Sequence, residues 1–391
     1  MTGAVTGWAW RTPLGDSIDG VLGRLVAGVR AATDQLPFDA STCSVRVGAP
    51  IPSQPGRSPH ERFLRRMGLF GVEAAKEATR AAGVRPGPRV GLFIAYGGLR
   101  AHWNEMMPAL AAQEPDGRGA WERGLKLLHP DWMLRHLSNN AQALLAADLG
   151  AKGEGLTLAG ANAGAQALSA ALRSLEVGAV EVAVVVAYDS LLDPETLVEL
   201  GARGTASSAP LSLLVAPYAR GANGFVPGEA GAALVLEPKA CAGARALAWV
   251  DAADGADGSA GAAAVETLAR VARRVGQGEQ VVDGAAQAQE PFDSAERRAI
   301  AALCAPGAVL TAVAGATGQL GAAMPLVQVI ALAQALRSGT LPPIAGLEGT
   351  DEPGTTGLRP LVAAERTLAR SALLLSAGSP GLAGAVRVEV P

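Results

Sequence analysis

The stretch from Leu156 to Leu175, "LTLAGANAGAQALSAALRSL", turns from an apolar strand through small residues into an alanine-rich helix. Many enzymes hold a nucleophile at such an elbow, because the helix N-terminus stabilises negative charge. This chain has Ala161 and Asn162 at the turn. Neither a methyl group nor a carboxamide is a useful nucleophile at neutral pH, so covalent catalysis would need a side chain that the elbow lacks.

The side chains that could supply a base or a thiolate lie away from this elbow. The chain has four histidines, all within its first 136 residues, and three cysteines: His60, His102, His129, His136, Cys43, Cys241 and Cys304. Neither set has the short spacing of a zinc site, and no two cysteines form a Cys-x-x-Cys pair. We therefore expect reduced structural cysteines, hydrogen-bonded histidines, and no metal or cofactor.

The elements that hold the elbow follow from the hydrophobic pattern. Two continuous apolar runs, "VGLFIAYGG" from Val90 and "VEVAVVVAYD" from Val180, predict parallel strands buried on both faces. Helices are predicted over Arg62–Ala82, which carries an apolar stripe, and from about Gly164 to Gly178. Strands that alternate with helices in this way predict a layered α/β protein.

The chain also repeats itself. The segments "GAALVLEP" (Gly231–Pro238) and "GAVRVEVP" (Gly384–Pro391) share Gly-Ala, a valine four residues on and a closing proline. Two halves that each end in such a strand, residues 1–238 and 239–391, would suit a duplicated fold. The low-complexity "DAADGADGSAGAAA" from Asp251 is expected to form an exposed loop that leads into the second half.

Composition limits the classes of partner. The 391 residues are 49% hydrophobic and 18% charged, with a formal net charge of −3 and no block of like charges. This balance argues against nucleic acid or an anionic membrane as the main partner. The N-terminal "MTGAVTGWAW" lacks the pattern of a signal peptide, and no run of about 18 apolar residues suggests a membrane span. We expect a cytoplasmic protein.

Five stretches resemble a known family in order and approximate spacing. They are "VTGWAWRTPLG" from Val5, "ERFLRRMGLFGVEAAKEA" from Glu61, "LSNNAQALLAADLGAKGEGLTLAGANAG" from Leu137, "GFVPGEAGAALVLEP" from Gly224 and "LPPIAGLE" from Leu341. They are similar to the β-ketoacyl-acyl carrier protein synthases of the thiolase fold. The resemblance implies a five-layer αβαβα sandwich of two similar halves. It also implies an acyl chain carried on a cysteine at the N-terminus of a central helix, beside two histidines.

At each catalytic position of that family, this sequence has a residue without the required chemistry. Matching the family's glycine to Gly164 puts Ala161 at the nucleophile, and a shift of one residue would put Asn162 there. The first histidine falls on Ala285, in "DGAAQAQEPFDSAE". The segment "AGATGQLGAA" has Ala314 in place of the lysine and Gln319 in place of the second histidine. The gating loop survives as "SAGSPGLAG", where Gly378 and Gly381 match and Ser379 replaces a phenylalanine.

Subunits of this character are found among the family, as the β-subunits of type II polyketide ketosynthases, called chain length factors. The resemblance implies that this chain forms a heterodimer with an active ketosynthase. In that dimer this chain would form part of a tunnel for the growing acyl chain, which an acyl carrier protein delivers. The segment between the Val90 strand and the elbow would contribute to that tunnel. Large side chains suited to its wall are Trp103, Met106, Met107 and Met133, together with Asn162 at the elbow. The alternative is that they are ordinary interface core.

Several alternatives stay open. The chain could be a stand-alone malonyl-carrier-protein decarboxylase that uses Asn162 and Gln319 as an amide oxyanion site, or a homodimeric acyl-carrier-binding scaffold. Arg62, Arg65 and Arg66 could face an acidic carrier protein or form a solvated helix face. Alanine at the nucleophile position and the short chain favour a polyene (including aryl polyene) or fatty-acid-like product over an aromatic one.

Overall fold

The computed structural model describes residues 2–98, 103–112, 124–258, 264–349, 358–378 and 381–391. Its main sheet has eleven strands in the order β10-β8-β7-β12-β13-β6-β1-β5-β4-β2-β3. The first five strands along the chain are β1 (Gly3–Arg11), β2 (Val90–Tyr96), β3 (Gly155–Ala159), β4 (Val182–Ser190) and β5 (Glu229–Pro238). The others in this sheet are β6 (Ala248–Ala256), β7 (Val281–Asp283), β8 (Val309–Thr311), β10 (Arg359–Pro360), β12 (Ser371–Gly378) and β13 (Leu382–Glu389). A separate small sheet pairs β9 (Thr340–Leu341) with β11 (Glu365–Arg366).

The two halves of the main sheet repeat one topology. In the first half β2 is parallel to β3 and β4, and β5 is antiparallel to β4 and β1. In the second half β7 is parallel to β8 and β12, and β13 is antiparallel to β12 and β6. The segment "GAALVLEP" lies in β5, and "GAVRVEVP" begins in β13 and ends two residues after it. The two strands hold equivalent places in the sheet. Three residue pairs between β1 and β6 join the halves, and we propose that the boundary lies just after Pro238.

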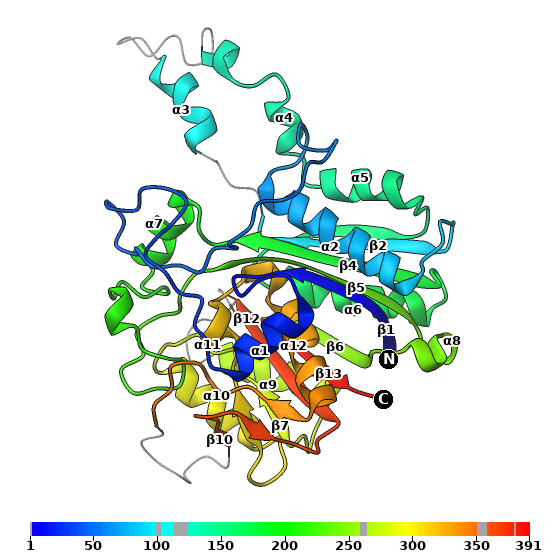
Figure 1. The fold of residues 1–391 in the computed structure, drawn as a ribbon, viewed down its shortest axis with the longest axis vertical. Coiled ribbons are helices and arrows are strands. Elements are labelled where there is room, and N and C mark those ends of the chain that lie inside the picture. Colours follow the sequence, from blue (N-terminus) through cyan, green and yellow to red (C-terminus); the bar gives the residue numbers. More distant parts are fainter. Residues whose placement is uncertain (1, 99–102, 113–123, 259–263, 350–357, 379–380) are drawn as a thin grey trace.

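Helices complete the layers (Figure 1). On one outer face α2 (Arg66–Ala82) packs on β1, β5 and β4, with α5 (Asn140–Leu149) beside it. On the other, α9 (Ala264–Val275) packs on β6 and β13, beside α10 (Phe292–Ala301). Between the two halves of the sheet lie α6 (Ala163–Glu176) and α12 (Met324–Ser338), which contact each other. The predicted five-layer α/β sandwich of two similar halves is therefore confirmed.

The remaining helices of the described residues are short. They are α1 (Ile18–Val26), α3 (Trp103–Ala111), α4 (Trp132–Arg135), α7 (Pro194–Ala202), α8 (Lys239–Ala242), α11 (Val313–Thr317), and the 3₁₀ turns η1 (Gly124–Leu127), η2 (Leu211–Leu213), η3 (Gly243–Arg245) and η5 (Gly321–Ala323). The described parts of residues 103–137, which include α3, η1 and α4 and which we call the arm, project from the sandwich at the top of Figure 1. No helix of the described ranges is both long and apolar enough to span a bilayer.

Two sequence predictions need correction. The helix expected from Arg62 begins at Arg66, because residues 60–63 form a turn in which the N–H groups of Phe63 and Leu64 both donate to the His60 carbonyl. The loop expected from Asp251 is a strand as far as Ala256. The segment is rich in glycine and alanine, which are typical of loops, so the sequence showed no sign of a strand. In the structure its backbone pairs continuously with β13, and this pairing provides the hydrogen bonds that a loop would make with water.

Candidate functional site

The elbow is a tight turn between β3 and α6. The Gly160 N–H donates to the Tyr96 carbonyl at 2.9 Å, and its φ of 125° favours glycine. Asn162 precedes the first helical residue and is 1% exposed, whereas Ala161 is exposed. A Cβ built on Gly164 would lie 2.2 Å from the Ala322 carbonyl oxygen, so this close approach between α6 and η5 requires glycine.

The end of β12, which belongs to the segment expected to form a gating loop, lies against the elbow. A Cβ built on Gly378 would lie 2.9 Å from the Cβ of Ala161. Ser376 Oγ donates to Asn162 Oδ1 at 2.9 Å, and the buried Nδ2 of Asn162 has no hydrogen-bond partner among the described residues. Gly381 is buried just before β13, and Ser379 lies outside the described residues. The elbow and the end of β12 are therefore in direct contact, at the methyl group of Ala161 and at the side chain of Asn162.

Ala285 and Gln319 also come together. Gln319 Nε2 donates to the Ala285 carbonyl at 2.7 Å and to the Ala286 carbonyl at 3.1 Å. These two bonds use both hydrogens of the amide, and Gln319 is 6% exposed. The backbone of Gln319 is held in turn, because its N–H donates to the Val226 carbonyl. The amide thus braces a loop, and its donors are not available to a substrate oxygen.

The braced loop is strained and rests on buried acids. Ala286 and Ala288 have φ of 49° and 50°, which residues with a Cβ rarely adopt. Glu296 accepts from the Ala285 N–H at 2.7 Å and from the Tyr218 hydroxyl at 2.7 Å. Burial raises the pKa of Glu296 to about 7. It does the same for Asp293 and, beneath the next turn, for Asp283.

Ala314 lies on that next turn, α11. It is 6% exposed, and the neighbouring Val313 N–H donates to Asp283 Oδ1 at 2.8 Å. Gln328 Nε2 donates to the other oxygen of Asp283 at 2.7 Å. The methyl group at position 314 offers neither charge nor donor. The thiol of Cys304 offers no nucleophile either, because burial raises its pKa to about 11 and keeps it protonated.

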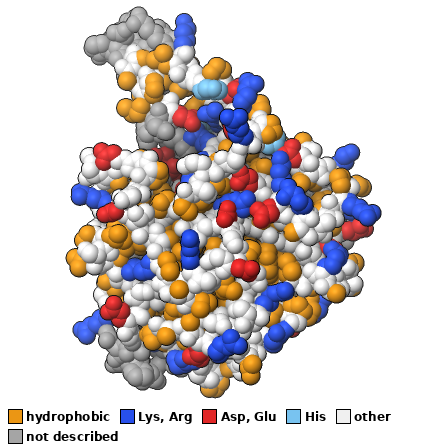
Figure 2. Space-filling view, in the orientation of Figure 1, with side chains coloured by type: hydrophobic (Ala, Val, Ile, Leu, Met, Phe, Trp, Pro, Cys, Tyr) orange, Lys and Arg blue, Asp and Glu red, His pale blue; other side chains and the backbone are white. Residues whose placement is uncertain are grey.

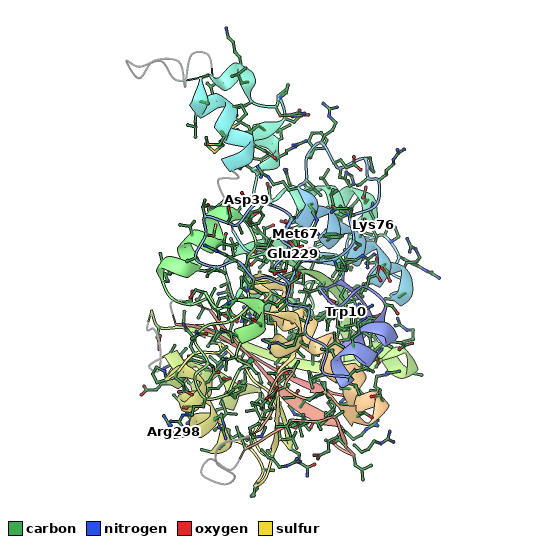
Figure 3. All side chains as sticks on the ribbon, turned by 60° about the vertical axis from the view of Figure 1, so that its left-hand side comes forward. Trp10, Asp39, Met67, Lys76, Glu229 and Arg298 are labelled. Atoms are coloured by element: carbon green, nitrogen blue, oxygen red, sulfur yellow. The ribbon has the colours of Figure 1, made fainter. Side chains whose placement is uncertain are left out.

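A cavity of about 610 Å³ lies beside the elbow, at the carboxyl ends of β2 and β4. Tyr96 and Asp189 line it where these strands end, and Arg65, Arg66 and Met67 line it from the start of α2. Figure 3 shows Met67 and Glu229 close together near the middle of the molecule. Such volumes are typical of small-molecule sites, and the ends of parallel strands are where α/β proteins place them.

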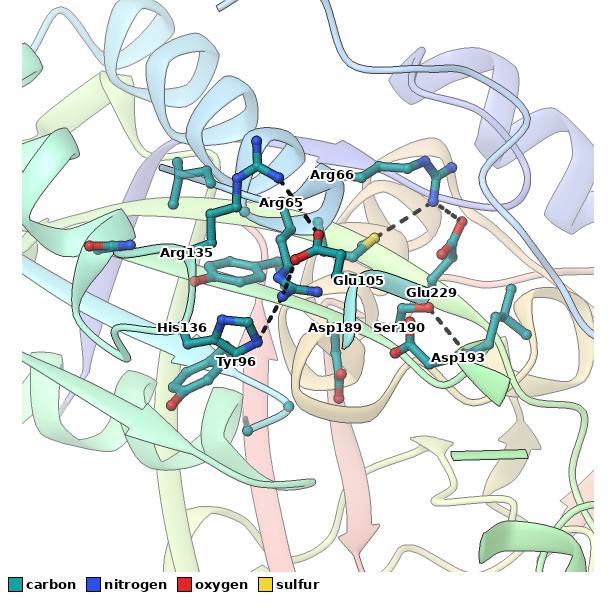
Figure 4. A pocket seen from close by; sticks show the side chains of 18 of the residues that line it. Arg65, Arg66, Tyr96, Glu105, Arg135, His136, Asp189, Ser190, Asp193 and Glu229 are labelled. Carbon is teal, nitrogen blue, oxygen red and sulfur yellow. Dashed lines mark hydrogen bonds and ion pairs between the residues drawn. The ribbon is translucent and has the colours of Figure 1, made fainter. Parts of the chain in front are cut away.

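One ion pair joins the arm to the sandwich across this cavity, and a second lies within the arm (Figure 4). Arg65 Nη2 donates to Glu105 Oε2 at 3.0 Å, and Glu105 Oε1 lies 3.6 Å from Arg135 Nη1. Burial lowers the pKa of Arg65, which Glu105 partly offsets. Arg65 also contacts His136 Nε2 at 2.8 Å, while His136 Nδ1 lies 2.8 Å from the Trp132 carbonyl. His136 therefore links Arg65 to the backbone of α4.

Glu229, from the glycine-rich "VPGEAG", lines the same cavity. Its Oε1 accepts from Arg66 Nη1 at 2.6 Å and from the Ile51 N–H at 2.9 Å. Arg65 and Arg66 therefore turn inward, and only Arg62 of the three predicted arginines is largely exposed, with a side chain 72% accessible. Arg65 and Arg66 therefore form ion pairs inside the cavity and do not belong to a solvated basic helix face.

The methionines predicted for a tunnel wall lie outside this cavity. Met106 is half-buried, whereas Met107 and Met133 are 50% and 66% exposed on the arm. Trp103 begins α3, but its side chain lies outside the described residues. Their assignment to a tunnel stays a prediction. The sequence did carry a signal for the cavity, because Tyr96 and Asp189 are polar residues at the ends of the two apolar runs.

Comparisons with known proteins agree with this geometry. Residues 4–242 match the model of the β-ketoacyl synthase N-terminal domain. The chain belongs to the β-ketoacyl synthase family. The comparison with curated proteins found no match.

Solved structures share the fold across the whole chain. A β-ketoacyl synthase from Burkholderia phymatum STM815 superposes with a TM-score of 0.84 at 18% identity. The ishigamide ketosynthase/chain length factor gives 0.83 at 20% identity. The AntDE:AntF complex, a type II polyketide acyl carrier protein with its ketosynthase bound to the hexaketide, gives 0.82 at 19%. Each match covers 100% of this chain and 99% of the other.

Proposed function

We propose that this chain is a non-catalytic ketosynthase-like subunit, a chain length factor, which pairs with an active ketosynthase and shapes its acyl tunnel in type II polyketide biosynthesis. One observation carries the proposal. Gln319 stands where the family has a catalytic histidine, and it spends both amide hydrogens on the carbonyls of Ala285 and Ala286. The position has become a structural brace, opposite an elbow whose Ala161 cannot carry an acyl group.

The surface of the chain supports pairing. Seven of the fourteen large hydrophobic side chains that are exposed in the described residues lie on the arm: Met107, Leu110, Leu125, Leu127, Met133, Leu134 and Leu137. Figure 2 shows hydrophobic side chains gathered on this projecting part. A contiguous exposed apolar patch is typical of an interaction surface.

The edge of the main sheet lies beside the elbow. No described strand pairs with the outer edge of β3, whose end residues Gly155 and Ala159 are exposed. Unpaired strand edges favour association unless something covers them. A partner of the same fold would cover both β3 and the arm, which favours a ketosynthase as the partner and a cytoplasmic acyl carrier protein as the donor of the chain.

The decarboxylase alternative is disfavoured by the same brace. An enolate formed from malonate needs hydrogen-bond donors aimed at its oxygen. Gln319 has both hydrogens engaged, and Asn162 Oδ1 is an acceptor bound to Ser376. The elbow therefore keeps one amide donor at most, without a base beside it among the described side chains.

Co-expression with candidate active ketosynthases, followed by native mass spectrometry, tests the proposal. We expect a 1:1 heterodimer with one of them and condensation activity only in that complex. The chain alone should release no carbon dioxide from radiolabelled malonyl carrier protein. A stable homodimer that captures no ketosynthase would contradict the proposal and support the acyl-carrier-binding scaffold.

A further inference from the structure

The end of β12 has a strand beside it on one side only. Among the described residues, β13 pairs with it as far as Gly378, whereas its pairing with β7 stops at Leu374. The last four residues of the strand, 375–378, therefore have one open edge. Carbonyls two residues apart in a strand point to the same side, so this edge has acceptors that need hydrogen-bond partners from elsewhere.

Side-chain carboxamides bond to the acceptors on this open edge. Gln328 Nε2, from α12, donates to the Leu375 carbonyl at 2.8 Å. Gln287 Nε2, from the braced loop, donates to the Ala377 carbonyl at 3.2 Å. Because these carbonyls are two residues apart, the two amides continue the row of hydrogen bonds that β7 leaves unfinished.

A third carboxamide holds the residue between these two carbonyls. Ser376 Oγ donates to Asn162 Oδ1 at 2.9 Å, and both side chains are buried. The neighbouring strand leaves no space around this bond. A Cβ built on Gly384 of β13 would lie 2.6 Å from Ser376 Oγ and 2.9 Å from Asn162 Oδ1. Three consecutive residues of β12 are therefore bonded to carboxamides from the elbow, the braced loop and α12.

Movement of this strand end would break all three contacts at once. Each hydrogen bond lost without replacement lowers the population of a moved state by about fivefold. Three such losses together lower it on the order of 100-fold. A gate needs two positions of similar free energy, and these contacts strongly favour one of them.

We propose that Asn162, Gln287 and Gln328 form a carboxamide clamp that fixes the end of β12 against the elbow, where the resemblance implied a moving gate. The clamp belongs to this chain alone. Its consequence in a heterodimer rests on the proposed function: the complex would work without any movement of this strand end.

Hydrogen–deuterium exchange on the purified chain tests the clamp. In the wild type, residues 375–378 should exchange as slowly as residues 372–374 of the same strand. Gln287→Ala, at a half-buried position, should speed exchange at 375–378 by about fivefold and change the melting temperature by less than about 2 °C. Gln287→Glu has no N–H to donate and should act in the same direction. Gln277→Ala, at an exposed position after α9, is the matched control and should leave exchange unchanged.

A cross-link tests whether the strand end has to move in the working complex. A Cβ on Gly378 would lie 2.9 Å from the Cβ of Ala161, so the double variant Ala161→Cys/Gly378→Cys should form a disulfide after a small shift. The disulfide is formed in the isolated chain and verified by mass spectrometry before an active ketosynthase is added, so the thiols of the partner stay reduced. We expect equal rates of product formation with the oxidised and the reduced form of the same variant.

Three results would overturn the inference. They are loss of activity on cross-linking with recovery in dithiothreitol, failure of the two cysteines to join, and exchange at residues 375–378 that Gln287→Ala does not change. Failure of the proposed function is a separate outcome. If no ketosynthase pairs with the chain, that function fails, while exchange on the isolated chain still decides whether the clamp exists.

Discussion

At the scale of single residues, Ala161 lies at an elbow that has the backbone geometry of a nucleophile site but no nucleophilic side chain. The elbow keeps the N-terminus of α6, which would stabilise a thiolate. We predict that Ala161→Cys gives a thiol that iodoacetamide alkylates faster than Cys241, the exposed cysteine that serves as internal control. The variant should still condense at least about 10⁴-fold more slowly than an active ketosynthase, because the other catalytic groups are missing. Alkylation rates and product formation are both followed by mass spectrometry.

Condensation by the single variant at a rate near that of an active ketosynthase would show that the site needs only its thiol. Alkylation no faster than that of Cys241 would show that the elbow has lost its electrostatic character as well.

One contact of the candidate site could be predicted from the sequence. Motif spacing placed Ala285 and Gln319 at neighbouring positions of the fold, and they are in contact. The hydrogen bonds from Gln319 to the backbone could not be predicted. They involve a loop in which Ala286 has a left-handed conformation, and an alanine in a sequence gives no indication of that conformation. The pair Arg65–Glu105 spans 40 residues and follows no helical or strand period, so only the folded chain reveals it.

At the scale of elements, β7 and α10 enclose three carboxyl groups whose pKa burial raises to about 7: Asp283, Asp293 and Glu296. Their unfolded values lie near 4. Because the folded value is the higher one, the native state binds these protons more tightly. Their contribution to stability is complete below about pH 4 and is lost as the pH rises through about 7.

Glu296→Gln tests this contribution, because the amide stays neutral at every pH. We predict that the melting temperature of the variant rises relative to wild type by at least about 2 °C between pH 5 and pH 8. Differential scanning calorimetry at matched ionic strength measures the difference. Asp16→Asn, at a surface position before α1, is the control and should shift little with pH. A wild-type-minus-variant difference that does not change with pH would contradict the prediction.

Helices and strands with a clear hydrophobic pattern could be predicted from the sequence, and those without such a pattern could not. The strands β2 and β4 are continuous apolar runs, and α6 follows its small-residue pattern, so their existence was clear. The strand β6 was not, because half-exposed alanine, aspartate and glycine resemble a loop until β13 lies alongside. Strand identity there comes from a partner more than 120 residues away.

At the scale of the whole molecule, we propose that the exposed apolar side chains of the arm form the pairing interface. We predict that the double variant Leu127→Lys/Met133→Lys folds normally, since these side chains are 57% and 66% exposed. Its affinity for the active ketosynthase should fall at least about tenfold, because two charges would be buried in an apolar interface. Circular dichroism and native mass spectrometry report on the two properties.

Val177→Lys, at an exposed position far along α6, is the matched control and should pair as wild type does. Undiminished pairing of the double variant would place the interface elsewhere.

The brace formed by Gln319 has an evolutionary consequence. A reversion to histidine at this position would release the carbonyls of Ala285 and Ala286 and leave a loop with two left-handed alanines less supported. A single back-mutation would thus lower stability without restoring chemistry, since Ala161 and Ala285 would still be inert. Under the proposed function, each single step back towards an enzyme would therefore lower stability and restore no activity.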